Sequence, residues 1–291
     1  EGPFRLCGSE VIDIPLIPYI SVKGLSKVFW SRFGLAAFTK RSKLFNRVVT
    51  KTLFDGDDMV VLPKDDVVRA RRITMDMEFE DGGESTVLPS DIVKGIIDRS
   101  SDIFIMNFCL RRKSNECDDF PRDRGCVFLG KGVHRIPEDF GHITTREEAK
   151  RYIDECTDLG LVHIIGRNKL DSIWLNTGHK RDLMTICNCC PCCCLWNMTR
   201  NISDEIGGVF KRLDGVSVSV DTDRCIGCGS CHDICFTKAV TIDNGKCSID
   251  LGMCRGCGRC VEVCPTDSIT LEFDESVVGR EVDRIHSLVD L

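Results

Sequence analysis

Short apolar runs separated by polar and turn-forming residues set the pattern of the first two thirds of the chain. Residues 59–63 (MVVLP) and 86–89 (TVLP) predict short strands, and residues 103–108 (IFIMNF) predict a buried strand. Before that buried strand, Ser90 is expected to cap a helix that runs through Ser100. One face of this helix is apolar and should pack on the strands, through Ile92, Val93, Ile96 and Ile97.

A second helix is predicted from Thr145 to about Gly160, because Thr145 and Glu148 fit a capping box. The helix, the glycine and a strand at 161–165 resemble the end of a winged-helix motif, with a wing running into residues 173–175. A helix that reads DNA is basic, whereas this one carries Lys150 and Arg151 against a larger number of acidic residues. We therefore expect no nucleic-acid binding.

The 20 cysteines change this picture. Eight of them form two runs with the spacing C-x2-C-x2-C-x3-C, and the second run begins 29 residues after the first. The runs are Cys225, Cys228, Cys231 and Cys235, then Cys254, Cys257, Cys260 and Cys264. Two-residue gaps let one tight loop direct three thiolates at one centre. Gly227, Gly229, Gly256 and Gly258 permit the positive φ angles that such loops need.

This spacing, with Pro265 after the last cysteine, resembles the bacterial two-cluster ferredoxin over about 50 residues. The resemblance implies two 4Fe-4S clusters that exchange their fourth ligands. One cluster would be held by Cys225, Cys228, Cys231 and Cys264, and the other by Cys254, Cys257, Cys260 and Cys235. Phe236 departs from the pattern, which usually has proline there. Zinc sites use paired C-x2-C knuckles, so the spacing favours iron–sulfur ligation.

A second set of cysteines lies in a charged stretch after the predicted strand at 103–108. Cys109, Cys117 and Cys126 are flanked by five basic residues, which would lower thiol pKa values and offset the negative charge of a cluster. Three cysteines in an irregular, charged stretch are unlike a core, so we expect them to be metal ligands. The alternative is three unrelated buried or free thiols.

The densest group is the run CxCCxCCC, made of Cys187, Cys189, Cys190, Cys192, Cys193 and Cys194. Packing does not explain six thiols in eight residues. Adjacent cysteines point in different directions, so one ordinary cubane cannot use them all. The run is expected to hold a third cluster, a non-cubane or double cluster, or a thiol pair that takes electrons or sulfur. A structural zinc held by four of the thiols is the simpler alternative.

The combination TICNCCPCCCLW followed by a two-cluster ferredoxin domain resembles a group of ferredoxin-domain proteins from strictly anaerobic archaea and bacteria. The similarity extends back through LPSDIVKGIIDRSSDIFIMNFCLRR and EEAKRYIDECTDLGLVH. It implies that Cys109, Cys117 and Cys126 lie near the CxCCxCCC run and share one metal site with it. It also implies electron transfer, without naming a substrate.

Residues 14–54 contain eight Lys or Arg, interleaved with aromatic and apolar residues, and no Asp or Glu. The whole chain carries −6, so the remainder carries −14. The segment either packs on the body of the protein, docks on an acidic partner, or lies on an anionic membrane surface. We expect no transmembrane helix, because no apolar run reaches 18 residues. Clusters survive in reducing conditions, which predicts the cytoplasm of an anaerobe.

The expected fold class is α+β. The predicted organisation is a basic segment (1–54), a cysteine-rich α/β domain (55–200), a linker (201–220), a two-cluster ferredoxin domain (221–274) and an acidic helical tail (275–291). The predicted function is electron transfer, as the electron-delivery subunit of a larger anaerobic oxidoreductase complex. The alternatives are an enzyme whose extra cysteine site performs disulfide or sulfur chemistry, and an iron–sulfur regulator that binds DNA.

Overall fold

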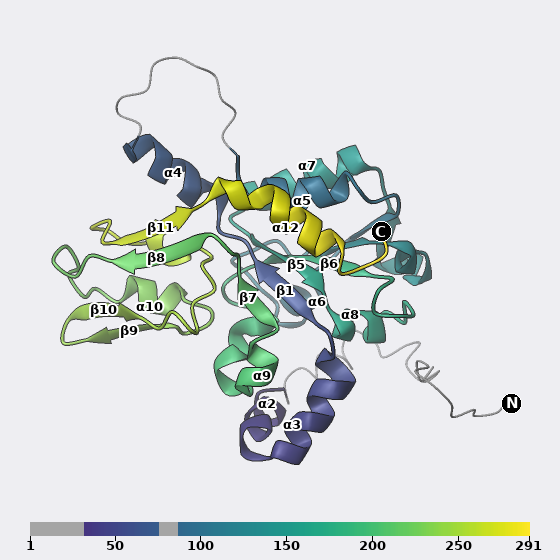
Figure 1. Cartoon of the computed structure of the whole chain (residues 1–291), viewed down its shortest axis with the longest axis horizontal. Helices are drawn as coiled ribbons and strands as arrows, with labels where there is room; N and C mark the ends of the chain where they lie inside the picture. Colours follow the sequence, from purple (N-terminus) through teal and green to yellow (C-terminus); the bar gives the residue numbers. More distant parts are fainter. Residues whose placement is uncertain (1–31, 76–86) are drawn as a thin grey trace, which may run out of the picture.

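A seven-stranded sheet forms the body of the protein in the computed structural model, which describes residues 32–75 and 87–291 (Figure 1). The strand order is β4-β2-β3-β6-β5-β1-β7. All neighbours are antiparallel except β1 and β7. The strands are β1 (Asp58–Val61), β2 (Ile103–Met106), β3 (Val127–Leu129), β4 (Gly141–Ile143), β5 (Val162–Arg167), β6 (Met184–Cys189) and β7 (Phe210–Arg212). The sequence correctly predicted an α+β fold.

Three helices cover one face of this sheet, namely α5 (Pro89–Ile97), α7 (Arg146–Asp158) and α12 (Val278–His286) (Figure 1). The apolar face predicted for α5 is fully buried, together with Ala149 and Ile153 of α7 and Val282 and Ile285 of α12. Thr145 caps α7 as predicted, because its side chain accepts a hydrogen bond from the Glu148 amide at 3.2 Å.

The other face carries shorter elements around a second core. These are η1 (Thr50–Phe54), η4 (Leu195–Asn201) and α9 (Asp204–Gly207), with α8 (Lys169–Trp174) beside them. The rings of Trp196 and Phe210 stack there with centroids 4.4 Å apart, and Phe210 also meets Phe236 edge-on. The connections η2 (Lys131–Arg135) and η3 (Glu138–Phe140) follow β3, and α6 (Leu110–Ser114) follows β2.

The C-terminal part builds a smaller unit from two antiparallel strand pairs (Figure 1). Strand β8 (Val216–Val220) pairs with β11 (Ile269–Phe273), and β9 (Val240–Asp243) pairs with β10 (Lys246–Ile249). Two short helices, α10 (Ser230–Ile234) and α11 (Arg259–Glu262), each begin after a left-handed glycine. The matching halves give the unit the pseudo-two-fold arrangement that the repeated cysteine spacing implies.

Residues 201–220 carry α9, β7 and β8, so this predicted linker is built into both parts of the protein. Strand β7 closes the large sheet against β1, and β8 enters the smaller unit. Helix α4 (Asp65–Met75) packs on β11, and η5 (Glu275–Val277) leads into α12. The tail is helical as predicted. The proposed domain boundaries otherwise remain predictions.

Three local predictions were wrong. Residues 87 and 88 of the predicted strand 86–89 are not in a strand, and residue 86 lies outside the described residues. The cap of α5 is Leu88, whose amide donates to the Asp91 carboxylate at 2.7 Å, while Ser90 lies inside the helix. Strand β5 is no wing, because it pairs with β1 and β6 inside the sheet and is followed by α8.

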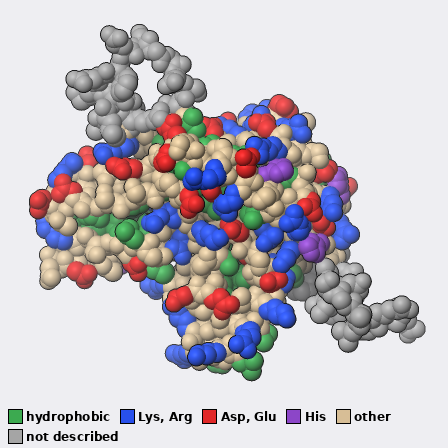
Figure 2. Space-filling view, viewed as in Figure 1, with side chains coloured by type: hydrophobic (Ala, Val, Ile, Leu, Met, Phe, Trp, Pro, Cys, Tyr) green, Lys and Arg blue, Asp and Glu red, His purple; other side chains and the backbone are tan. Residues whose placement is uncertain are grey.

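The described part of the basic segment forms α2 (Arg32–Arg41), α3 (Lys43–Val49) and η1, and residues 14–31 lie outside the described residues. Ala36 and Phe54 are buried, and Lys40 donates to the Arg200 carbonyl at 2.6 Å, so the segment packs partly on the body. Figure 2 shows Lys and Arg side chains beside hydrophobic ones on this lobe. Phe38, Leu44 and Val48 are exposed there. Within the described residues, every helix is too short or too polar to cross a bilayer.

Candidate iron–sulfur sites

Each half of the C-terminal unit encloses a cavity lined by four of the eight motif cysteines. Site I is the cavity lined by Cys225, Cys228, Cys231 and Cys264. Site II is the cavity lined by Cys235, Cys254, Cys257 and Cys260. In both cavities the fourth thiol comes from the other half of the motif, which is the exchange that the resemblance to ferredoxin implied. Ligation itself remains a prediction.

The groups around these thiols fit iron–sulfur clusters. Backbone amides donate to cysteine sulfurs in both sites: Cys247 to Cys225 at 3.3 Å, Ser268 to Cys264 at 3.3 Å, Ala239 to Cys235 at 3.3 Å and Gly256 to Cys254 at 3.4 Å. An amide pointing at sulfur stabilises the thiolate form that a metal requires. At Cys264, burial opposes ionisation, but hydrogen bonds from Ser268 and Thr266 outweigh it and lower the thiol pKa to about 7.

Positive-φ glycines shape both cysteine loops as predicted. Gly227 (φ +67°) and Gly256 (φ +63°) take left-handed conformations in equivalent positions. At Gly227 a Cβ atom would lie 2.2 Å from the Gly245 carbonyl oxygen, so only glycine fits against the β9–β10 turn. Gly229 (φ +87°) needs the conformation alone, since no atom lies within 4 Å of its Cβ position.

The two sites differ in their surroundings. Site I lies toward the outer end of the unit, with Cys228 exposed and the neighbouring Ile226 64% exposed. Site II faces the large sheet. The Cys257 carbonyl accepts from the Lys64 amide at 3.1 Å, and the positive charge of Arg212 on β7 interacts with Cys254. Site II is thus the inner site.

The loop that carries Cys109, Cys117 and Cys126 is held by a fully buried arginine. The Arg112 guanidinium donates to the carbonyls of Pro121 at 2.7 Å, Asn188 at 2.8 Å and Arg124. Asn188, inside the CxCCxCCC run, donates to the Gly125 carbonyl at 2.8 Å and pairs with the His163 ring at 2.8 Å. This network fastens the loop to β6, so the loop and the run lie together as predicted.

Four of the nine thiols form one tight group, and the single metal site that the resemblance implied for all nine stays a prediction. Successive residues of a strand face opposite sides of the sheet. Cys187 and Cys189 of β6 belong to the core that also holds Trp196, and Cys194 joins them. Cys190 and Cys193 turn into the opposite core, where Cys117 lies. The alternation along β6 therefore divides the run.

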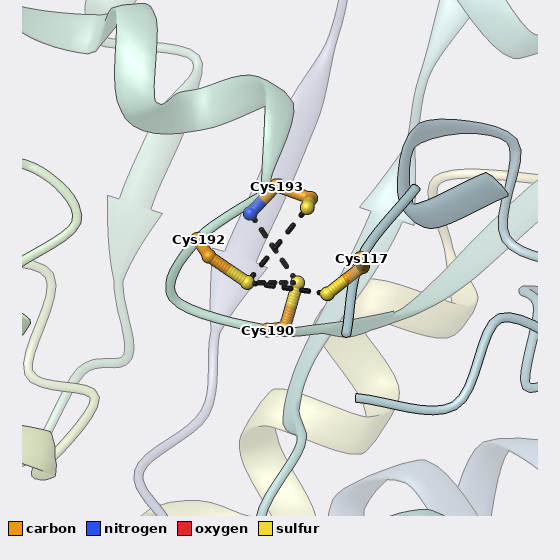
Figure 3. Close-up of side chains that lie close together, drawn as sticks. All are labelled: Cys117, Cys190, Cys192 and Cys193. Carbon is orange, nitrogen blue, oxygen red and sulfur yellow. Dashed lines mark hydrogen bonds between the residues drawn. The ribbon is translucent and has the colours of Figure 1, made fainter. Parts of the chain in front are cut away.

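The tight quartet comprises Cys117, Cys190, Cys192 and Cys193, whose sulfurs all lie within 4.8 Å of one another. Figure 3 shows three of these side chains on one turn after β6, facing Cys117 from a separate segment. The Cys192 sulfur is 3.5 Å from that of Cys117, 3.4 Å from that of Cys190 and 3.7 Å from that of Cys193. Cys192 is exposed and the other three are buried.

Each of the other five thiols interacts electrostatically with Arg111, and together the five are called the arginine-centred group. Its members are Cys109, Cys126, Cys187, Cys189 and Cys194. The Cys126 and Cys187 sulfurs lie 3.7 Å apart. Burial alone would lower the pKa of Arg111, but the nearby thiols raise it. Hydrogen bonds from Cys187 and Cys194 lower the pKa of Cys189 well below its ordinary value, and the arginines add to this. The group therefore favours a thiolate beside a fixed positive charge.

Sequence reasoning missed two contributors to these sites. Cys247 on β10 lies outside the motif, yet it lines site I with its sulfur 3.7 Å from that of Cys231. Arg112 was expected only to supply charge, whereas it organises the loop. The position of Cys247, in the connection between the two motif halves, was a signal in the sequence that could have pointed to it. Nothing in the sequence separates Arg112 from its basic neighbours.

Comparison with known proteins supports the C-terminal sites. Residues 224–275 match the 4Fe-4S dicluster domain family. Ferredoxin-2 of Desulfomicrobium norvegicum is 53% identical over 32 residues, which are 11% of this chain and 54% of that protein. The chain thus spans about half the length of this curated relative. No solved structure matches. The sites, the motif and these matches agree that residues 224–275 form a ferredoxin-type 4Fe-4S dicluster domain.

Proposed function

We propose that the protein transfers electrons between a redox partner at site I and thiol-ligated centres beside β6, as the electron-delivery subunit of a larger oxidoreductase complex. Bound 4Fe-4S clusters supply one-electron redox chemistry at sites I and II. The protein provides the thiolate ligands and the amide groups that donate to sulfur, and its fold sets the distances between the sites.

The observation that carries this proposal is the place of site II between site I and both groups of extra thiols. The Arg259 side chain of α11 donates to the Cys189 carbonyl at 2.5 Å, which joins site II to the run. Cys257 packs against the core that holds Cys187, Cys189 and Cys194. Cys235 of site II and Cys192 of the tight quartet line one surface hollow. A line of sulfur sites therefore runs from the outer tip to β6.

Aromatic packing keeps water from the inner part of this line. Phe236, next to Cys235, lies edge-on to Phe210, which stacks on Trp196 just after the run. All three rings are buried. Excluding water lowers the reorganisation that accompanies a change of charge and strengthens electrostatic interactions inside the site. This is the environment that electron exchange between neighbouring centres requires.

The arginine-centred group is the place that we propose for the additional iron–sulfur cluster. It offers five thiols, more than the four that a cubane uses, and Arg111 offsets part of the negative charge of a thiolate-ligated cluster. Its members come from the Cys109–Cys126 loop and from the CxCCxCCC run. The resemblance to proteins of anaerobes implies that these two segments share a metal site. The natural setting for such clusters is the cytoplasm of an anaerobe.

The lobe of α2 and α3 is the surface that we propose for a protein partner. Leu44 is 73% exposed and lies among Lys40, Arg41, Lys43 and Arg47. An apolar patch with a basic rim fits an acidic protein surface. An anionic membrane surface is the competing occupant. The two occupants can be told apart by measuring binding. An acidic protein partner is supported if its binding weakens as salt rises and the protein does not bind vesicles of anionic lipid.

Iron and acid-labile sulfide per chain test the proposed function, with EPR during stepwise reduction of protein purified without oxygen. Two cubanes account for about eight irons, and a third raises this to about twelve. We expect about twelve, with at least three reducible signals. About eight irons and two signals would contradict the additional cluster. Failure of the Cys257→Ser variant to slow reduction of the third signal would contradict the order of the sites.

A second function, an oxidoreductase for disulfide or sulfur chemistry, is favoured by one observation. Cys192 is exposed in a hollow that Arg200 and Lys238 also line, so an anionic substrate can approach its thiol. Reduction of a small disulfide by the chemically reduced protein, abolished by Cys192→Ala, would support this function. If the protein exchanges electrons but does not reduce the disulfide, the result would support the electron-carrier function instead.

A further inference from the structure

The tight quartet has a geometry unlike that of the two ferredoxin sites. Its four sulfurs lie within 4.8 Å of one another, and the Cys192 sulfur is 3.4–3.7 Å from each of the other three. In neither ferredoxin quartet, both of which lie in the described part of the chain, do three sulfurs approach one another so closely. The same ligand type is therefore presented at two different spacings.

The spacing decides how many metal atoms fit between the sulfurs. Four thiolates around one tetrahedral ion at about 2.3 Å place neighbouring sulfurs about 3.8 Å apart. In a cubane each thiolate binds its own iron from outside, so the four sulfurs must stand farther apart. The distances in the tight quartet match one ion and leave no room for an Fe4S4 core.

We propose that Cys117, Cys190, Cys192 and Cys193 bind a single tetrahedral divalent ion, zinc or iron(II), separate from every iron–sulfur cluster of the protein. This goes beyond electron transfer and does not rest on it. Cys187 and Cys189 are kept away from this site, because β6 places them on its opposite side.

Neighbouring groups compensate the negative charge that four thiolates and one divalent ion leave. The positive charge of the buried Arg112 interacts electrostatically with Cys190, and the Cys193 amide donates to the Cys190 sulfur at 3.4 Å. The Arg122 side chain donates to the Cys117 carbonyl at 2.7 Å and brings a second positive charge to the loop. Since the site is closed by four protein ligands, its first role is to clamp residues 109–126 to the end of β6.

Metal and sulfide analysis of two variants of the full chain tests the proposal. Cys192 is exposed, so Cys192→Ala removes a ligand with little effect on packing. We expect it to lose one metal ion per chain and no acid-labile sulfide. The matched control is Cys194→Ala, two residues along the run in the arginine-centred group, which should keep that ion. Loss of sulfide from Cys192→Ala, or loss of the same ion from both variants, would overturn the proposal.

X-ray absorption of the wild-type protein gives a second test that does not depend on a variant folding. If the ion is zinc, the zinc edge should show four sulfurs at about 2.3 Å and no metal neighbour. If it is iron, oxidation should give the EPR signal of isolated high-spin iron in addition to those of the clusters. A metal neighbour at the zinc edge, or a preparation with neither zinc nor isolated iron, would refute the single-ion site.

Discussion

The ferredoxin sites and the tight quartet each gather four cysteines, but they reach that arrangement by different routes. In the ferredoxin sites, gaps of two residues and left-handed glycines spread three thiols around a loop, and the fourth comes from the other half of the motif. In the tight quartet, Cys190, Cys192 and Cys193 leave one short turn after β6, and Cys117 closes on them from a loop held by Arg112. Local spacing thus sets the size of the cavity, and the size of the cavity sets the kind of metal centre.

The comparison also separates two ways to fix a ligand. The ferredoxin loops depend on positive φ angles, so the positions that need them can be recognised in the sequence by their glycines. The tight quartet depends on a long-range contact between a buried arginine and backbone carbonyls. The first route is local in sequence and the second is not. Three substitutions test this difference, beginning with the largest expected effect, and a fourth probes a buried carboxyl group outside both kinds of site.

Cys257→Ser should remove a whole cubane, about four irons and four sulfides, because it deletes a ligand of site II. Site I and the tight quartet share no ligand with site II, so their metals should remain. Iron and sulfide analysis with EPR measures the loss. The matched variant Cys228→Ser should remove the other cubane signal instead. Loss of all iron from either variant would contradict independent sites.

Arg112→Met should destabilise the protein by about 4 kcal/mol, because it leaves buried carbonyl groups without a donor at a cost of about 1–3 kcal/mol each. The metal ion of the tight quartet should be lost, and the ferredoxin signals should be unchanged. Anaerobic urea denaturation and metal analysis measure both effects. The control is Arg151→Met on the exposed face of α7. Equal effects from the two variants would show that Arg112 does not hold the loop.

Gly227→Ala should cost about 3 kcal/mol and reduce cluster content at site I, since the added Cβ meets the Gly245 carbonyl in a conformation already unfavourable for alanine. Gly229→Ala should cost only about 1–2 kcal/mol, because its Cβ enters open space. Urea denaturation and the EPR intensity of site I compare the pair. Identical losses would mean that φ alone, and not the close approach, selects glycine.

Asp57→Asn should change the pH dependence of stability without changing any metal signal. Burial raises the pKa of Asp57 to about 7, above its ordinary 3.8, so the folded state keeps a proton that the unfolded state releases between those pH values. The wild type should therefore lose stability as pH rises from 4 to 7. The variant should show no gain in stability at pH 4 and a clear gain at pH 7, where the linkage cost of the wild type is almost fully present.

Urea denaturation at several pH values measures this, with exposed Asp66→Asn as control. Asp57 directly precedes β1, accepts a hydrogen bond from the Lys169 amide at 2.7 Å and interacts electrostatically with Asp171, whose pKa burial also raises. A parallel shift of both variants would place the pH dependence elsewhere in the molecule.

The sequence specified the ferredoxin sites more completely than the rest. The eight motif cysteines line two cavities in the predicted exchanged arrangement, and the glycines take the predicted conformations, because each requirement is expressed within a few residues. Helix α7 and its Thr145 cap were predicted for the same reason.

The rest depended on contacts between distant residues. The division of the nine extra cysteines follows from where β6 ends and from which core each face of the sheet meets, and neither is encoded locally. The burial of Arg112 and the approach of Cys247 to site I depend in the same way on tertiary packing. The strand predicted at 86–89 failed because Leu88 is recruited as the cap of α5.

The ferredoxin unit is tethered at both ends. Strand β7 precedes it and pairs with β1, while α12 follows it and lies across α5, with Arg99 and Asp283 joined at 2.6 Å (Figure 1). Arg284 of α12 reaches Asp58 of β1 at 3.2 Å. A unit fastened at both ends is expected to keep its place against the large sheet. For the electron transfer that we propose, the separation between its inner site and β6 would then be set by the fold.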